Sequence, residues 1–189
     1  MNSKEFAKIQ KKLSNKLSES RFQHTLGVAY TAGCLAMKHG EDFNKAITAG
    51  LLHDCAKYMN GSEMLKLAEK YKLDITSAEQ IKPDLLHAKL GSYFAEKKYK
   101  IDDEEILSAI RYHTTGKPDM TMLEKIVYLA DYIEPGRDKM PRLNDIRKIA
   151  FEDIDACLRM VLEDSVKYLQ SSGMEIDDTT IKTYEFYCK

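Results

Sequence analysis

The stretch Leu51-Leu52-His53-Asp54-Cys55-Ala56-Lys57 sets an imidazole and a carboxylate side by side directly after an apolar run. Neighbouring helix positions point about 100° apart, so His53 and Asp54 share a target only if the helix ends here or meets a cleft end-on. Neutral imidazole and carboxylate are both good ligands for zinc, iron and manganese. The stretch therefore predicts a bound divalent metal, although an isolated His-Asp pair is also common at the surface end of a helix.

The composition describes an ordinary water-soluble chain. It has 189 residues, of which 43% are hydrophobic and 31% charged, with a formal net charge of −1. No global field recruits nucleic acid, so a polyanion would need a local basic cluster or a metal. No apolar run reaches the roughly 20 residues that span a bilayer, and residues 1–16 lack a signal-peptide core. Four scattered cysteines fit a reducing compartment. We expect a cytoplasmic protein with no nucleic-acid or membrane partner.

The apolar pattern predicts an all-α fold. Helical spacing is frequent, strand-like alternation is hard to find, and there are only nine Gly and four Pro. A capping box at Thr121 and Glu124 is expected to start one helix, and a weaker box at Ser77 and Gln80 one further turn. The tail after Gly173 is weakly predicted. We expect a single domain over residues 1–189, with helices near 6–17, 18–39, 46–52, 63–71, 84–98, 101–113 and 121–134, and two more within 144–172.

The histidines are distributed over this helical pattern in a way that suggests an internal site. His39 stands beside Gly40 at a helix end, where it is simply explained as a partner of the helix dipole. Long-range spacing of ligands is typical of metal sites inside helical bundles. An internal ion-pair network is the structural alternative. Six metal-competent side chains come from five predicted helices: His24, His53, Asp54, His87, His113 and Asp131.

Four segments together resemble a known family: residues 21–28 (RFQHTLGV), 51–57 (LLHDCAK), 109–116 (AIRYHTTG) and 130–137 (ADYIEPGR). They are similar to the HD-domain superfamily of metal-dependent phosphohydrolases, and the last two blocks point to its YqeK-type symmetrical bis(5′-nucleosyl)-tetraphosphatases. The resemblance covers core motifs in residues 21–137. It implies a helical bundle with the metal site inside, a homodimer, and cleavage of the dinucleoside polyphosphate diadenosine tetraphosphate into two ADP.

The resemblance also implies roles for individual residues. The principal metal is expected at His24, His53, Asp54 and Asp131; iron comes first, and manganese, cobalt, nickel or zinc also suit these donors. Such an ion lowers the pKa of bound water towards about 7 and polarises a phosphoryl oxygen. The expected catalytic residues are Asp54, Lys57, His87 and His113. The expected substrate contacts are Asp54, Cys55, Ala56, Lys57, His87, His113, Thr114, Asp131, Ile133 and Arg137.

Two of these assignments carry alternatives. His87 and His113 could hold a second metal, or they could contact phosphates as cations; we prefer phosphate contact, because only Asp54 offers a bridging carboxylate. Lys57 and Arg137 are expected to neutralise the polyphosphate, and Arg suits bidentate contact. The Thr114 hydroxyl and N–H can face an anion. Arg21, one turn before His24, could orient that histidine or touch phosphate.

Two other functions are compatible with the same residues. One is an HD phosphohydrolase for another nucleotide, such as a nucleoside mono- or triphosphate or a guanosine alarmone. The absence of an obvious second catalytic domain disfavours a bifunctional alarmone enzyme. The other is a nucleotide-binding regulator with little turnover, which has less need of six intact metal-competent side chains.

Overall fold

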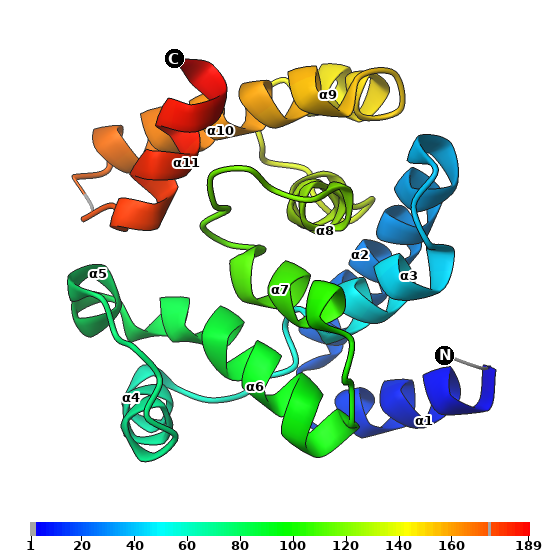
Figure 1. The fold of residues 1–189 in the computed structure, drawn as a ribbon, viewed down its shortest axis with the longest axis vertical. Helices are drawn as coiled ribbons and strands as arrows, with labels where there is room; N and C mark the ends of the chain where they lie inside the picture. Colours follow the sequence, from blue (N-terminus) through cyan, green and yellow to red (C-terminus); the bar gives the residue numbers. More distant parts are fainter. Residues whose placement is uncertain (1–2, 174) are drawn as a thin grey trace.

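Helix α8 (Met122–Ile133) is the element around which the other helices are arranged. A computed structural model describes residues 3–173 and 175–189. Figure 1 views α8 nearly end-on in the middle of the molecule, between α2, α3 and α7 on one side and α9 and α10 on the other. The remaining elements are α1 (Ser3–Ser14), α2 (Glu19–His39), α3 (Phe43–Leu52), α4 (Gly61–Lys70), α5 (Ser77–Ile81), the 3-10 turn η1 (Pro83–Leu86), α6 (His87–Tyr99), α7 (Glu104–Tyr112), α9 (Leu143–Ala150), α10 (Ile154–Ser171) and α11 (Asp178–Cys188).

The described part of the chain is helical without strands, as predicted, and forms a single all-α domain. Local capping explains several boundaries. The Ser18 side chain accepts a hydrogen bond from the Arg21 N–H at the start of α2, and Gly40 ends that helix with φ of 74°. The predicted capping box of Thr121 and Glu124 starts α8. These caps satisfy backbone groups that the helix ends leave open.

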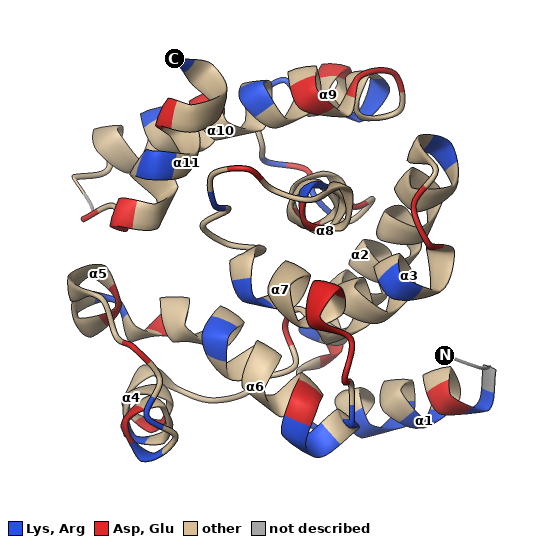
Figure 2. Ribbon diagram, in the orientation of Figure 1, with Lys and Arg blue, Asp and Glu red and all other residues tan. Residues whose placement is uncertain are grey.

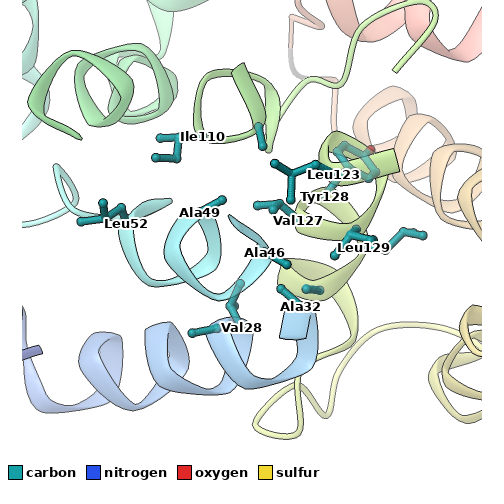
Figure 3. Close-up of a cluster of buried hydrophobic side chains, with 14 of the residues drawn as sticks. Val28, Ala32, Ala46, Ala49, Leu52, Ile110, Leu123, Val127, Tyr128 and Leu129 are labelled. Atoms are coloured by element: carbon teal, nitrogen blue, oxygen red, sulfur yellow. The ribbon is translucent and has the colours of Figure 1, made fainter. Parts of the chain in front are cut away.

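The close crossing of α2 and α3 determines where the functional residues meet. A Cβ atom added to Gly50 would lie 2.9 Å from the Ala29 Cα, so only glycine allows this backbone separation. Figure 3 shows the small side chains of Ala32, Ala46 and Ala49 in the same core. Because the two helices are in such close contact, the end of α3 lies beside the first half of α2.

The structure corrects several boundaries, including those of α1, which was predicted near 6–17, and of α3, which was predicted near 46–52. The capping box of α5 is formed by Thr76 and Glu79, one residue before the predicted pair, because Thr76 is the residue with extended backbone. The helix predicted from residue 84 begins at His87, after the 3-10 turn that Pro83 opens. The weakly predicted tail contains α11, whose N-terminus is capped by Asp177.

Charged residues of both signs are interspersed over the helices, as Figure 2 shows. Of the helices that the structure describes, none combines the length and apolar character needed to cross a membrane. With charges mixed at this scale, local groups of side chains, and not an overall field, decide which ligands bind.

Candidate metal centre

The six metal-competent side chains converge from five helical elements. His24 lies on α2, Asp131 near the end of α8, and His87 is the first residue of α6. Helix α3 ends at Leu52 and turns follow. His53, the C-cap, keeps helical backbone dihedrals, and its Nε2 lies 3.5 Å from Asp54 Oδ2. His113 likewise caps the end of α7. Helix ends thus position His53, Asp54, His87 and His113 close together, as the sequence predicts.

Hydrogen bonds fix the two principal imidazoles in one tautomer. His53 Nδ1 donates to the Gly50 carbonyl oxygen at 2.6 Å, and His24 Nδ1 donates to Glu134 Oε1 at 3.0 Å. A carbonyl or a carboxylate oxygen can only accept, so both Nε2 atoms of the neutral rings carry lone pairs. Within the described residues these two buried Nε2 atoms have no hydrogen-bond partner.

These unpartnered nitrogens face carboxylate oxygens. His24 Nε2 lies 3.0 Å from Asp131 Oδ1, and His53 Nε2 lies 3.5 Å from Asp54 Oδ2. Ligand atoms of His24, His53 and Asp131 all lie within 4.8 Å of one another. Lone pairs and anionic oxygens at such distances repel unless a cation or a proton lies between them. Two imidazole nitrogens with carboxylate oxygens suit a divalent transition metal, so the residues fit the ion that the sequence predicts.

The electrostatics of the metal centre favour the ionised forms of Asp54 and Asp131. Burial works against ionised Asp54, but the adjacent imidazoles, His53 first, hold its pKa well below the usual range. The pKa of Asp131 is likewise lowered against the effect of burial, first by its contact with His24. Burial is the largest single influence on His53 and lowers its pKa, but the charges of Asp54 and Asp131, with the hydrogen bonds to Asp54 and to the Gly50 carbonyl, together outweigh it and raise the pKa. Both carboxylates are therefore anionic and ready for a cation.

A second group adjoins the first through the other oxygen of Asp54. Asp54 Oδ1 lies 3.3 Å from His87 Nε2 and 3.8 Å from His113 Nε2, and the two Nε2 atoms are 3.1 Å apart. His113 Nδ1 donates to the Ile110 carbonyl oxygen at 2.7 Å, and His87 Nδ1 donates to that of Asp84. Ligand atoms of His53, Asp54 and His113 also lie within 4.8 Å of one another.

This geometry disagrees with the expectation that His87 and His113 act as cations. Burial lowers the pKa of His87 to about 3 and that of His113 to about 4. Both rings are thus neutral near pH 7, and their Nε2 atoms accept instead of donating. The Thr114 hydroxyl lies 3.2 Å from His113 Nε2 and 3.3 Å from His87 Nε2, so it can donate to one of them.

The expected phosphate-binding cations differ in their surroundings. Lys57 Nζ lies 3.0 Å from His87 Nδ1, and burial lowers its pKa. Arg137 instead binds a predicted metal ligand: its Nη2 donates to Asp131 Oδ1 at 2.7 Å and its Nε to the Asp131 carbonyl oxygen at 2.9 Å. Arg21 Nη1 donates to Asp54 Oδ2 at 2.8 Å. The two arginines thus orient the two carboxylates, and Arg21 does not contact His24 in the way that the sequence suggests.

Three of the expected substrate contacts lie in the core. Cys55, Ala56 and Ile133 are 1%, 0% and 3% exposed. The Cys55 thiol donates to the Gly91 carbonyl oxygen at 3.5 Å, and burial raises its pKa to about 12. These side chains pack inside the molecule, so contact with a substrate could come only from their backbone. His39, as expected, lies outside the metal centre and hydrogen-bonds to the Ala150 carbonyl oxygen.

Glu134 is a functional residue that the sequence reasoning missed. Besides accepting from His24, it accepts from the Gly136 N–H through Oε2 at 2.6 Å. A Cβ on Gly27 would lie 2.5 Å from the same Oε2, which explains a glycine one turn after His24. Arg147 donates to the carbonyl oxygens of Glu134 and Arg137 and so holds this loop. The only signal in the sequence is the position of Glu134 within the block at residues 130–137.

Two cavities flank the metal centre. The basic cleft, about 450 Å³, is lined by Lys16, Ser18, Arg21, Lys57, Tyr58, Met59, Met64 and Asp84. The apolar cavity, about 590 Å³, runs from Thr114 along α8 and α10 to the start of α11. Its lining includes Leu85, Tyr128, Tyr132, Met140, Tyr168 and Ile176, together with the charged Lys82, Lys139, Asp164, Glu175 and Asp177. The His87 ring contacts one lining residue of each cavity: Lys57 of the cleft at Nδ1 and Thr114 of the apolar cavity at Nε2. Both volumes suit a small organic ligand.

Known proteins share this arrangement. The HD domain model matches residues 21–136. The symmetrical bis(5′-nucleosyl)-tetraphosphatase of Bacillus subtilis is 37% identical over 92% of each chain, and that of Halalkalibacterium halodurans is 40% identical over 89% of each. A crystal structure from Clostridium acetobutylicum, described as a predicted HD superfamily hydrolase involved in NAD metabolism, has a TM-score of 0.92 at 39% identity over 96% of each chain. The chain therefore belongs to the HD-domain family, in the branch of these symmetrical bis(5′-nucleosyl)-tetraphosphatases.

Proposed function

We propose that this protein is a metal-dependent hydrolase that cleaves diadenosine tetraphosphate symmetrically into two molecules of ADP. The observation that carries the proposal is the pair of buried, unpartnered Nε2 atoms of His24 and His53, which face the carboxylates of Asp131 and Asp54. The two cavities on either side supply room for a substrate with two ends. The names of curated relatives of similar length support the same activity.

His24, His53, Asp54 and Asp131 are the proposed ligands of the principal ion. A divalent ion held there supplies Lewis-acid activation of water and of a phosphoryl oxygen. Arg137 and Arg21 hold the two carboxylates by charge-assisted hydrogen bonds, which fix their orientation. His53 and His24 are fixed by Gly50 and Glu134. The chain therefore presents a preorganised set of donors, which is the main structural requirement for this chemistry.

We further propose that His87, His113 and Asp54 would hold a second cation, with Asp54 shared between the two groups of ligands. Neutral rings whose Nδ1 atoms donate to backbone carbonyls leave only acceptors on the Nε2 side. Acceptors cannot bind phosphate oxygens directly. A second cation would give Asp54, His87 and His113 roles in catalysis without requiring either histidine to be charged.

Hydrolysis adds the oxygen of water to one of the two central phosphorus atoms and breaks the bond from that phosphorus to the bridging oxygen. The bridging oxygen keeps the electron pair of the broken bond and becomes an oxygen of the terminal phosphate of the other ADP, and the surplus proton of the water passes to solvent. Lys57 and Thr114 stand on opposite sides of the His87 ring and can contact phosphates on either side of the scissile bond. Charge-assisted contacts of this kind stabilise the leaving phosphate.

The cofactor, assembly and compartment complete the proposal. Iron is the first candidate metal, because two histidines with carboxylates suit non-haem iron as well as manganese. Homodimer formation is proposed through α2, where exposed Tyr30, Cys34 and Met37 lie on one helix face. A cytoplasmic location accords with four free cysteines, two of them buried.

The decisive experiment is a single turnover of metal-loaded protein on diadenosine tetraphosphate in isotopically labelled water. The expected product is ADP alone, with label in one of each pair. ATP plus AMP would refute symmetric cleavage. Faster turnover of a nucleoside monophosphate, triphosphate or guanosine alarmone in the same assay would favour another HD phosphohydrolase, and tight binding without cleavage would favour a regulator.

A further inference from the structure

The basic cleft adjoins the metal centre through two of its lining residues. Arg21 Nη1 donates to the proposed metal ligand Asp54 at 2.8 Å, and Lys57 Nζ lies 3.0 Å from His87 Nδ1. The same lining includes Lys16, in the connection between α1 and α2, and Tyr58, in the turn that follows His53. A ligand bound to these side chains therefore lies one residue away from the metal-competent groups.

The charge of the cleft suits a polyanion. Lys16, Arg21 and Lys57 contribute three positive charges, and Asp84 contributes one negative charge. Arg21 pairs with Asp54, but in the described part of the chain neither lysine forms an ion pair with a carboxylate. The proton on His87 Nδ1 goes to the Asp84 carbonyl oxygen, so this nitrogen cannot accept from the Lys57 ammonium group. A phosphate group would supply the missing acceptors.

The cleft also contains groups that inorganic phosphate would not use. Tyr58 is 39% exposed, and Lys16 Nζ lies 5.1 Å from its ring centroid. An exposed aromatic ring beside two unpaired cations offers a stacking surface next to a phosphate site. Asp84 adds a carboxylate, which suits the hydroxyl donors of a ribose. The set therefore matches a nucleotide and not a bare anion.

We propose that the basic cleft binds the second nucleoside diphosphate unit of the dinucleotide, with its phosphates on Lys16 and Lys57 and its base on Tyr58. The inference rests on the proposed function. The other nucleoside occupies the apolar cavity beyond Thr114, so two halves of identical chemistry are held by two different sites. Tyr58 thereby determines the preference for a dinucleotide over a polyphosphate with one nucleoside.

The test compares diadenosine tetraphosphate with adenosine 5′-tetraphosphate, which keeps all four phosphates but lacks the second adenosine. Tyr58→Leu is expected to lower kcat/KM for the dinucleotide about 10-fold, mainly through KM, and to leave adenosine tetraphosphate unchanged, because stacking is lost only for the second base. Lys16→Gln is expected to lower kcat/KM for both substrates, because both carry the two phosphates that the cleft would hold.

Matched controls separate these effects from folding. Tyr58→Phe retains the ring and should behave as the wild type, and Lys11→Gln removes an exposed lysine from α1, outside the cleft lining. Circular dichroism checks the fold of each variant. If the wild type cleaves the dinucleotide while Tyr58→Leu and Lys16→Gln match it, the cleft assignment is wrong and the proposed function stands. If the wild type does not cleave the dinucleotide, the proposed function fails and the cleft assignment fails with it.

Discussion

The basic cleft and the apolar cavity border the same metal centre and differ in almost every physical property. The cleft has three cations and one partly exposed tyrosine in about 450 Å³. The cavity has about 590 Å³, and its lining combines tyrosines and aliphatic side chains with charges of both signs: Lys82, Lys139, Asp164, Glu175 and Asp177. A substrate with two identical halves is thus met by two unlike surfaces, and the centre between them must locate the middle of the phosphate chain.

In the proposed assignment the cleft would gain affinity mainly from charge, and charge is screened by salt. The cavity would gain affinity mainly from apolar burial and stacking, which salt affects much less. The proposed division of the substrate therefore has consequences that differ between the two sides. Substitutions in the metal centre should lower the activity on every substrate equally. The effect of a substitution in the cleft or the cavity should depend on which part of the substrate that site binds.

The largest effect is expected for Asp54→Asn, which breaks the centre itself. The substitution keeps the shape but removes the charge that faces both histidine groups. Losing several kcal/mol of metal-dependent stabilisation should lower kcat by roughly 10³-fold or more. Initial rates on diadenosine tetraphosphate and adenosine tetraphosphate should fall by the same factor, and bound metal should fall with them.

Asp155→Asn is the matched control for that experiment, because Asp155 pairs with Lys125 at the surface, away from the centre. It should retain the wild-type rate and metal content. Near wild-type turnover of Asp54→Asn would remove the metal centre from the mechanism, and the comparison of its two sides would lose its basis.

Glu134→Gln should have the next largest effect, on metal affinity. Each oxygen of Glu134 accepts one hydrogen bond, from His24 Nδ1 and from the Gly136 N–H. Glutamine offers one acceptor and one donor, so one of these partners must lose its bond. Loss of such an orienting contact typically weakens metal binding by about 10- to 100-fold.

Metal titration of the apoprotein followed by calorimetry measures that affinity directly, and NMR of the histidine rings reports the tautomer of His24. Glu152→Gln, a substitution at an exposed residue in the turn after α9, is the control. An unchanged affinity would mean that Glu134 serves only the fold of the loop, through Gly136 and Arg147.

The sequence predicted the positions of most helices and the convergence of six metal-competent side chains, whose role as metal ligands stays a prediction. Both follow from local signals: apolar periodicity, the caps at Ser18 and Thr121, and the His-Asp pair at a helix end. The family resemblance added ligand roles that no periodicity could supply. The positions of the helix ends mattered most, because His53 and His113 each follow directly on the last residue of a helix.

The sequence did not predict features that depend on packing between distant segments. Glu134 lies 110 positions from His24, and nothing local indicates that the two are in contact. The neutral state of His87 and His113 depends on burial, which composition does not reveal. Arg137 was expected on phosphate but contacts Asp131, because the loop that Arg147 holds turns it back towards α8.

The histidines between the two cavities predict a pH-dependent stability of the apoprotein. The folded pKa values of His87 and His113 are about 3 and about 4, below the ordinary value of 6.5. The unfolded state therefore binds more protons between about pH 4 and 6.5, so stability falls as pH falls through this window. Each histidine contributes up to about 1.4 kcal/mol per pH unit. The raised pKa of His53 has the opposite sign and acts above pH 6.5.

Urea unfolding of chelated protein between pH 7 and 4.5 measures this slope. His113→Gln should flatten it, whereas His39→Gln, on the far end of α2, should not. The same slope in the wild type and in His113→Gln would place His113 in a solvated position and contradict the neutral, buried arrangement next to Asp54.

The smallest expected effect sharpens the comparison most, because it tests the apolar side alone. Tyr132 lines the apolar cavity next to Asp131 and is half-buried. Tyr132→Ala should raise KM about 10-fold for diadenosine tetraphosphate and for adenosine tetraphosphate alike, because each presents one adenosine to this cavity and loses one stacking contact.

Tyr132→Phe keeps the ring and should match the wild type. Tyr58→Leu in the cleft should affect the dinucleotide only. If Tyr132→Ala were also selective for the dinucleotide, the two cavities would not differ in the half of the substrate that they hold, and the assignment of the first nucleoside to the apolar cavity would be wrong.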